Sequence, residues 1–315
     1  MGILLGLLTA SCWGTSDFVA RFAAHKIGAL RTSLYMQLAG FLLLSLCLPW
    51  LGGWGHLADG SGWQPWAWGV LAGVLNCVAT LTLYRSFEIG KLAVVAPISA
   101  SYPVLTVLLS FLSGEHLQLT RAFGIACTLL GVALVAGGEK SPETLSPSST
   151  QSVASPAVPD PNASLLVEAG TETAPRSGKG IGMALCSALG FGFLFWLLGI
   201  RIVPVTGATQ AVWMIRLTSS ILTALVILSI KQPISLPRSG SIPAWLAVMG
   251  ALDTGAFMLN NFGMQIEQVA VVSVLASLYG AVTVGLAAIF LRENVSRWQW
   301  LGIVSIFLGI FLISR

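Results

Sequence analysis

The most constraining feature of this chain is that its two ends repeat one another. Residues 2–137 and 180–315 each contain five long apolar runs, and adding 178 to a position in the first half reaches a similar residue in the second. The pairs that support this register are Gly14 with Gly192, Glu115 with Glu293, Gly131 with Gly309 and, after a slip of one residue, Tyr102 with Tyr279. The sequence therefore predicts two copies of one five-helix unit.

The composition of the chain places these helices in a lipid bilayer. Hydrophobic residues make up 55% of the sequence and charged residues only 9%, whereas a soluble domain carries about 25% charged residues. A run of about 18 or more apolar residues crosses the hydrocarbon core as a helix. Such runs are found at 2–22, 30–51, 66–87, 92–113, 119–137, 180–200, 206–230, 243–265, 269–291 and 297–314. We therefore expect an all-α polytopic membrane protein with ten transmembrane helices.

The longest polar stretch, residues 138–179, is rich in Ser, Pro and Thr, and is predicted to be a flexible linker between repeats 1–137 and 180–315. The five cysteines fall within apolar runs without paired spacing or a nearby His, so we expect no metal and no cofactor. The net charge of +4 comes from loop Lys and Arg residues, which in a membrane protein report orientation and not a nucleic-acid partner.

Basic residues are distributed unevenly among the connections between the predicted helices. In the first half, five lie after the first and third helices, and Arg121 alone lies after the second or fourth. In the second half, four lie after the seventh and ninth helices, and Arg201 alone lies after the sixth or eighth. Because each half has an odd number of helices, this reversal predicts inverted-topology repeats. By the positive-inside rule, the linker is predicted to be cytoplasmic and both termini to lie outside a bacterial inner membrane.

Several segments resemble a known family. The Trp13-Gly14 pair, the run from Gly90 to Glu115, the segment RAFGIACTLLGVALV and their echo SLYGAVTVGLAAIFLRENVSRWQWLGIVSIFLGIFL are similar to EamA-type permeases of the drug/metabolite transporter superfamily. The resemblance covers both halves and leaves out the linker. It implies a ten-helix bundle built from duplicated five-helix units, with a central substrate cavity that opens alternately to each side. The acid at Asp17 and the long linker depart from the commoner family pattern.

This resemblance favours a secondary transporter of small polar or amphipathic metabolites, with amino acids or related compounds as the leading substrates and export as the leading direction. The sequence contains no nucleotide-binding motif, so the predicted driving force is an ion gradient, with protons as the candidate, or the substrate's own gradient. A lipid-linked or sugar carrier or flippase is the alternative within the transporter class. An intramembrane enzyme and a structural or sensory membrane protein are the alternatives outside it.

Ionisable side chains at membrane depth mark candidate transport residues, because each costs about 2.5–3.5 kcal/mol to insert. Asp253 lies near the middle of the eighth predicted helix, above Asn260 on the same helical face. It is a candidate substrate-ammonium contact or proton carrier. Arg216 shares a face of the seventh helix with Gln210 and Trp213. It either binds a substrate carboxylate or neutralises Asp253 in an interhelical salt bridge.

Asp17 precedes Arg21 by four residues in the first helix, which favours an exposed ion pair near the membrane edge. The sharper hypothesis is a proton-coupling acid, as in the small multidrug members of the superfamily. Its predicted position near the helix end places Asp17 at a different depth from Asp253, which argues against a catalytic pair. Trp13 and Asn76 are further candidates for the cavity wall, with helix packing as the alternative.

The fourth predicted helix contains Pro97 and Pro103 with Tyr102 between them. Proline within a membrane helix frees backbone carbonyl groups, so a locally opened helix beside the cavity is predicted. The equivalent part of the ninth helix has Tyr279 followed by Gly280 in place of the second proline. Kinks that only permit close helix packing are the alternative for both helices.

Two further patterns are assigned to structure. Glu115 and Glu293 each lie just before a predicted helix, where a carboxylate is expected to cap the helix that follows. Tryptophans cluster around the loop between the second and third helices and are interpreted as interfacial anchors, with carbohydrate stacking as the alternative.

Overall fold

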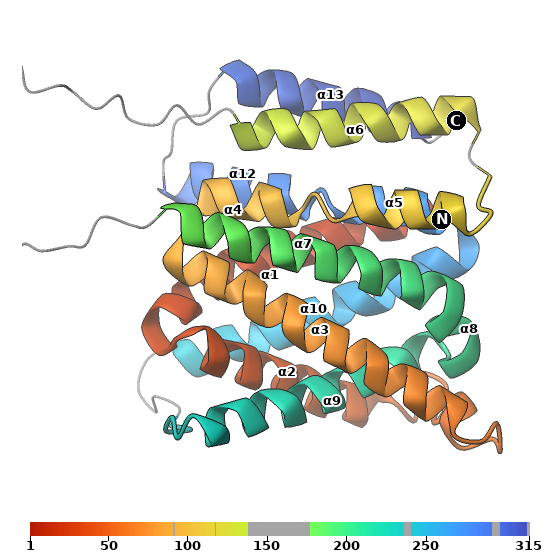
Figure 1. Ribbon diagram of the computed structural model, residues 1–315, viewed down its shortest axis with the longest axis vertical. Helices are drawn as coiled ribbons and strands as arrows, with labels where there is room; N and C mark the ends of the chain where they lie inside the picture. The colour runs from red at the N-terminus through yellow and green to blue at the C-terminus, as the bar shows by residue number, and fades with distance from the viewer. Residues whose placement is uncertain (91, 117, 138–176, 236–240, 292–296, 314–315) are drawn as a thin grey trace, which may run out of the picture.

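The computed structural model describes residues 1–90, 92–116, 118–137, 177–235, 241–291 and 297–313, and the regular structure within these ranges is helical (Figure 1). Helices satisfy their own backbone hydrogen-bonding groups, which an apolar chain in lipid requires. They are α1 (Gly2–Ile27), α2 (Ala29–Cys47), η1 (Gly55–Leu57), α3 (Gln64–Ile89), α4 (Leu92–Ser99), α5 (Pro103–Leu112), α6 (Leu119–Gly137), α7 (Ser177–Leu197), the π-helical turn η3 (Leu198–Ile202), α8 (Val203–Thr206), α9 (Ala208–Ser229), α10 (Ile242–Ile266), α11 (Val269–Ala276), α12 (Tyr279–Leu291) and α13 (Arg297–Ile313).

All ten ranges predicted to be helical contain helix, so the all-α polytopic fold class is confirmed, but the helices differ in length. Within the described residues, seven helical stretches are long and apolar enough to cross a membrane, judged by length and composition. Shorter apolar helices occupy the remaining three ranges, at Pro103–Leu112, Leu119–Gly131 and Trp300–Leu312. The predicted linker falls almost wholly outside the described residues, and α7 begins at Ser177, ahead of the boundary at 180.

Two of the predicted helices are each split in two. The fourth is divided at residues 100–102 into α4 and α5, and Pro103 begins α5, where its missing N–H is tolerated. The ninth is divided at residues 277–278 into α11 and α12, without a proline at the break. The chain therefore opens at equivalent places in its two halves.

Two connections depend on glycine. Gly28 alone joins α1 to α2, and Gly207 alone joins α8 to α9. Their φ angles are 84° and 88°, in the region that residues with a Cβ atom avoid. Each glycine lets the chain reverse at the edge of the bundle within a single residue.

Helices of the two halves pack against each other in mirrored pairs. α1 packs on α10 as α3 packs on α7, and α2 packs on α10 as α9 packs on α3. Both chain termini lie at one end of the bundle, whereas α6 ends and α7 begins at the other (Figure 1). Equivalent helices therefore run in opposite directions, as inverted-topology repeats require.

Two interfaces pair a helix with its own counterpart, α2 with α9 and α6 with α13. The second pair lies along one edge of the bundle (Figure 1). A Cβ atom on Gly131 would lie 2.7 Å from the carbonyl oxygen of Gly302, and one on Gly309 would lie 2.7 Å from that of Gly124. Small residues thus allow these two backbones to approach closely, as is common between membrane helices.

Matched contacts also hold the two helix breaks. A Cβ atom on Gly14 of α1 would lie 2.9 Å from the carbonyl oxygen of Tyr279, and one on Gly192 of α7 would lie 2.7 Å from that of Tyr102. Two threonine hydroxyls complete these contacts by donating to the glycine carbonyl oxygens, Thr283 to Gly14 at 3.1 Å and Thr106 to Gly192 at 2.9 Å. The same backbone approach therefore supports each interrupted helix.

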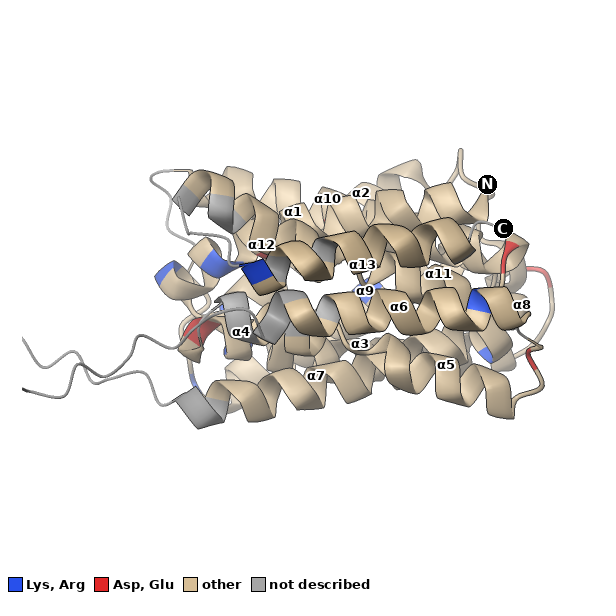
Figure 2. Cartoon of the chain, turned by 90° about the horizontal axis from the view of Figure 1, so that it is seen from above, with Lys and Arg blue, Asp and Glu red and all other residues tan. Residues whose placement is uncertain are grey.

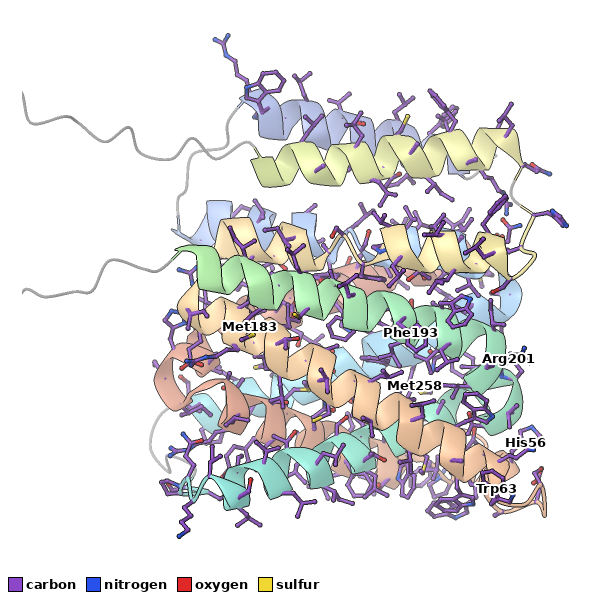
Figure 3. All side chains as sticks on the ribbon, viewed as in Figure 1. His56, Trp63, Met183, Phe193, Arg201 and Met258 are labelled. Atoms are coloured by element: carbon purple, nitrogen blue, oxygen red, sulfur yellow. The ribbon has the colours of Figure 1, made fainter. Side chains whose placement is uncertain are left out.

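Most of the charged residues lie toward the two ends of the bundle, and its long sides are formed almost entirely by uncharged residues (Figure 2). His56, Trp63 and Arg201 lie at the end that holds the termini, away from Met183 (Figure 3). Within the described part of the chain, the basic residues in or beside the helix ends on the linker side are Arg21, Lys26, Arg31, Arg85, Lys179, Lys231 and Arg297. The loop-by-loop charge bias is thus a difference between the two ends of the molecule.

Candidate functional site

A narrow cavity lies at the centre of the bundle, beside the two helix breaks. Its free volume is about 30 Å³, which is room for one or two water molecules. A metabolite can therefore occupy it only after the surrounding helices separate. The lining residues come from both halves: Trp13 and Asp17 of α1, Thr80 and Leu83 of α3, Tyr102 before α5, Phe191 and Phe195 of α7, Asp253 and Phe257 of α10, and Tyr279 of α12.

Aromatic rings form most of the cavity wall. The ring centroid of Trp13 lies 5.2 Å from that of Phe195, 5.3 Å from that of Phe257 and 6.2 Å from that of Tyr279. Tyr102 stacks on Tyr279 across the breaks, with 6.3 Å between centroids and 15° between planes. Such walls present apolar edges and electron-rich faces, which suit hydrocarbon groups and organic cations.

Two carboxyl groups face this aromatic wall. Asp17 is 6% exposed and has no hydrogen-bond or ion-pair partner among the described residues. The carboxylate of Asp253 instead lies with its Oδ2 2.7 Å from Nη2 of Arg216. The cavity therefore contains one paired acid and one free acid.

Arg216 is fully buried behind the cavity wall. Its Nη1 donates to Oε1 of Gln37 at 2.6 Å, and its guanidinium carbon lies 4.9 Å from the ring centroid of Phe257. A planar guanidinium suits this combination of carboxylate, amide and ring contacts. The predicted salt bridge between Arg216 and Asp253 is therefore present, and binding of a substrate carboxylate by Arg216 stays a prediction.

The expectation that Asp17 forms an exposed pair with Arg21 is wrong. Asp17 is buried in the cavity wall, because α1 continues to Ile27, five residues beyond the predicted end of the helix. Asp17 thus lies nearer the helix middle and lines the same cavity as Asp253, so the depth argument against a catalytic pair also fails. A catalytic dyad shares one proton between two acids, whereas Asp253 is bonded to Arg216.

Equivalent positions of the two repeats line the cavity. Eight of its ten lining residues form four equivalent pairs: Trp13 with Phe191, Asp17 with Phe195, Thr80 with Phe257, and Tyr102 with Tyr279. Sequence reasoning missed the three phenylalanines, Thr80 and Leu83. The repeat register could have identified Phe191 and Phe195, because they are the positions reached by adding 178 to Trp13 and Asp17.

Two candidates on α9 contact the loop after α2 and do not line the cavity. Nε2 of Gln210 donates to the carbonyl oxygen of Gly53 at 2.9 Å. Nε1 of Trp213 donates to the hydroxyl of Ser45 at 2.9 Å, and the Trp54 ring meets its ring edge to face at 5.1 Å. These contacts close the bundle at the end that holds the termini.

The candidate asparagines also lie outside the cavity lining. Nδ2 of Asn76 donates to the hydroxyl of Ser219 at 3.1 Å and joins α3 to α9. Nδ2 of Asn260 lies 3.6 Å from the sulfur of Met264 on its own helix. Asn261, one residue on, donates to the first carbonyl oxygen of α9 at 3.2 Å. These contacts match the helix-packing alternative.

The candidate backbone residues occupy both interrupted helices. Pro103 is buried at the start of α5, and Gly280 is buried next to Tyr279 at the start of α12. Pro97 lies within α4, and its side chain is outside the described set. The breaks themselves fall at the two tyrosines that line the cavity.

Glu115 caps a different helix from the one predicted. Its carboxylate accepts hydrogen bonds from the amides of Val269 at 2.7 Å and Ala270 at 3.3 Å, at the start of α11. The expectation that it caps α6 is wrong, because the loop after α5 folds over the neighbouring helix end. A carboxylate at this positive helix end is favourable. Glu293 lies outside the described residues.

Known proteins share this architecture. Residues 1–137 and 178–315 match the EamA-like transporter family. An uncharacterized protein of Methanocaldococcus jannaschii is 29% identical over 134 residues, which make up 42% of this chain and 94% of that protein. A crystal structure similar in fold has a TM-score of 0.71 at 16% identity, with 99% of this chain and 95% of that chain covered. With mirrored helix packing, a central cavity and a family match over both halves, the chain belongs to the EamA-like transporter family, whose members carry small molecules across membranes.

Proposed function

We propose that this protein is a secondary transporter that exports small amine-bearing metabolites, amino acids or related compounds, across the cell membrane. The observation that carries the proposal is the central cavity, where equivalent positions of both halves surround a free carboxyl group with aromatic rings. An ammonium group complements the carboxyl group, and an apolar body complements the rings. A site shared by inverted repeats supports alternating access, because the halves can rock around it.

Protons supply the driving force in this proposal. The charged form of Asp253 is held by Arg216 at 2.7 Å, so a proton on Asp253 removes that attraction. Arg216 also contacts Gln37 and Phe257, and in this proposal it keeps both contacts when Asp253 is protonated. A proton on Asp253 and a substrate ammonium group in the same cavity each add one positive charge, so the binding of either disfavours the binding of the other. This competition exchanges outward substrate movement for inward proton movement.

Proteoliposomes loaded with a metabolite panel test the coupling. Asp253→Asn is expected to abolish uptake driven by a pH gradient and to retain passive exchange of the same metabolite, which also shows that the variant is folded. Asp59→Asn, a matched change at an exposed loop acid, is expected to retain both. Driven uptake at the wild-type rate in Asp253→Asn would disprove the coupling.

We also propose that the linker lies in the cytoplasm and both termini lie outside. The excess of Lys and Arg at the linker end supports this orientation. A single cysteine at Ser148, in a background that lacks the five native cysteines, provides the test. We expect an impermeant thiol reagent to label it only after the cells are opened, and labelling in intact cells would reverse the orientation.

A further inference from the structure

The charges around the cavity favour amines without a carboxylate over amines that carry one. With all three groups ionised, Asp17 and Asp253 carry two negative charges against the single positive charge of Arg216. Asp253 and Arg216 neutralise each other as an ion pair at 2.7 Å, so the remaining negative charge is that of Asp17. An unpaired charge at membrane depth is costly, so a cation at this position is favoured.

A substrate carboxylate finds no equivalent partner. Among the described residues, no Lys, Arg or His lines the cavity. Arg216 is fully buried, with Nη1 held by Gln37 at 2.6 Å and Nη2 by Asp253 at 2.7 Å. To reach it, a substrate carboxylate must displace Asp253 and bring a second negative charge close to Asp17.

Building on the proposed transport function, we propose that the preferred substrate is a monoamine with an aromatic or similarly sized apolar body and no carboxylate. Its ammonium group binds Asp17, and its body packs against Trp13, Phe195 and Tyr279. The same rings contribute a favourable electrostatic attraction to the cation. Zwitterionic amino acids are therefore weaker ligands than the amines related to them by loss of the carboxyl group.

A series of phenyl compounds that differ mainly in their charged groups tests how ligand charge affects binding. Ligand-dependent thermal stabilisation of the purified protein is measured with phenylethylamine, phenylalanine, phenylpropionate and phenylethanol. We expect phenylethylamine to bind about tenfold or more tightly than phenylalanine, because only the latter brings a carboxylate. Asp17→Asn should weaken the amine about tenfold and leave phenylethanol unchanged, whereas Asp17→Glu and the loop control Asp59→Asn should retain amine binding.

Three results would overturn the substrate class: phenylalanine binding as tightly as the amine, Asp17→Asn binding the amine as the wild type does, or no amine binding at all. Metabolite exchange in proteoliposomes separates this failure from failure of the transport function. Exchange of other solutes without amine binding rejects the monoamine class and keeps the transporter. Absence of exchange for every solute of a broad panel rejects the transport function.

A second inference arises from the two stacked tyrosines, whose hydroxyl groups are not equivalent. The hydroxyl of Tyr102 donates to the carbonyl oxygen of Ser273 on α11 at 3.0 Å. The hydroxyl of Tyr279 is buried in the same way but has no hydrogen-bond partner among the residues that the structure describes. A buried hydroxyl without a partner is costly, so this asymmetry needs a cause.

The repeat supplies the missing acceptor. Adding 177 takes Tyr102 to Tyr279 and takes Ala96 to Ser273. The carbonyl oxygen of Ala96 accepts the amide of Ala100 at 2.9 Å, as that of Ser273 accepts the amide four residues later at 3.0 Å. The helices around them are also mirrored, because α5 packs on α11 as α12 packs on α4.

In an inverted repeat, alternating access proceeds by one repeat rocking against the other around the shared site. Because the two halves are equivalent, a contact that is made in only one half can be replaced by its counterpart when the opposite end opens. We infer that in the opposite-facing state Tyr279 donates to the carbonyl oxygen of Ala96, while Tyr102 releases Ser273. Each hydroxyl thus stabilises one of the two states. The matched contacts of Gly14 and Gly192 are both present in this structure. In this inference they stay in place while the hydroxyl groups exchange.

Single hydroxyl deletions test this exchange. Tyr102→Phe is expected to shift the equilibrium about fivefold away from the present state, and Tyr279→Phe about fivefold toward it, because each removes one buried hydrogen bond. Distances between spin labels across each end of the bundle report the populations. The labelled pairs are Ser61 with Gln265 at the terminus end and Arg85 with Arg297 at the linker end. Shifts in the same direction, or no shift in either variant, would overturn the exchange.

Discussion

Arg216 carries a buried charge whose main partner is a single carboxylate. Removing one member of a buried pair leaves the other uncompensated, which costs about 3–5 kcal/mol. Arg216→Met keeps the apolar length of the side chain but strands Asp253, which lies 2.7 Å away in the native protein. We expect a loss of this size in the free energy of unfolding, measured by thermal denaturation in detergent.

The double variant Arg216→Met with Asp253→Leu is the control, because it removes both charges together. It is expected to recover most of the stability while losing uptake driven by a pH gradient. A double variant as unstable as Arg216→Met alone would mean that packing around Arg216, and not its charge, supports the fold.

Single residues also show what the sequence could predict of the site. Asp253 and Arg216 stand out as charges within apolar runs, and the sequence predicts their pairing as one of two roles for Arg216. Phe195 and Phe257 were missed because phenylalanine is ordinary in a membrane helix, whether it faces lipid or a cavity. The predicted placement of Asp17 is wrong because α1 ends five residues later than expected, which puts Asp17 about 7.5 Å farther from that end of the helix.

At the scale of elements, the two helix breaks rest on close backbone contact. Gly14→Ala and Gly192→Ala each place a Cβ atom under 3.0 Å from the facing helix. Overpacking of this kind costs about 1–3 kcal/mol, so we expect both variants to lower the melting temperature by similar amounts. Gly255→Ala is the matched control on α10, because its added Cβ meets nothing within 4 Å. Equal losses in all three variants would contradict the role of the close approach.

The same contacts explain which elements could be predicted. The break before Pro103 follows from proline chemistry, and the sequence predicted an opened helix there. The break at residues 277–278 has no proline, and it is held by Gly14 on another helix. Contacts between distant segments of this kind leave no local pattern, so the structure was needed to find them.

At the scale of the whole molecule, the interfaces between the halves predict that the linker is dispensable for assembly. A protease site placed within residues 138–176 allows the chain to be cut after it has folded in the membrane. We expect residues 1–137 and 178–315 to co-elute from size-exclusion chromatography after cleavage, because helices of both halves surround the cavity. Separation of the two fragments would show that the covalent connection holds the bundle together.

The repeat and its inversion were readable from the sequence, because they depend on spacing and loop charge over long distances. Figure 2 shows the same charge separation in three dimensions. The contacts by which Gln210 and Trp213 close the terminus end could not be predicted from the sequence. Both residues were assigned to the substrate pathway only because they share a helical face. A shared helical face predicts which side chains point in the same direction, but it does not predict which other residues they contact.

The paired edge helices α6 and α13 have a consequence for how such a molecule can arise. Gly131 meets Gly302 and Gly309 meets Gly124, so one surface binds its own inverted copy. This is the isologous geometry of a homodimer, in which a single favourable substitution acts twice. A five-helix chain with that surface can associate as two antiparallel copies, and the Methanocaldococcus jannaschii relative, of which 94% aligns with 134 residues here, has about that length. Fusion into one chain lets the two copies diverge, and Asp17 opposite Phe195 is the divergence that gives the cavity its charge.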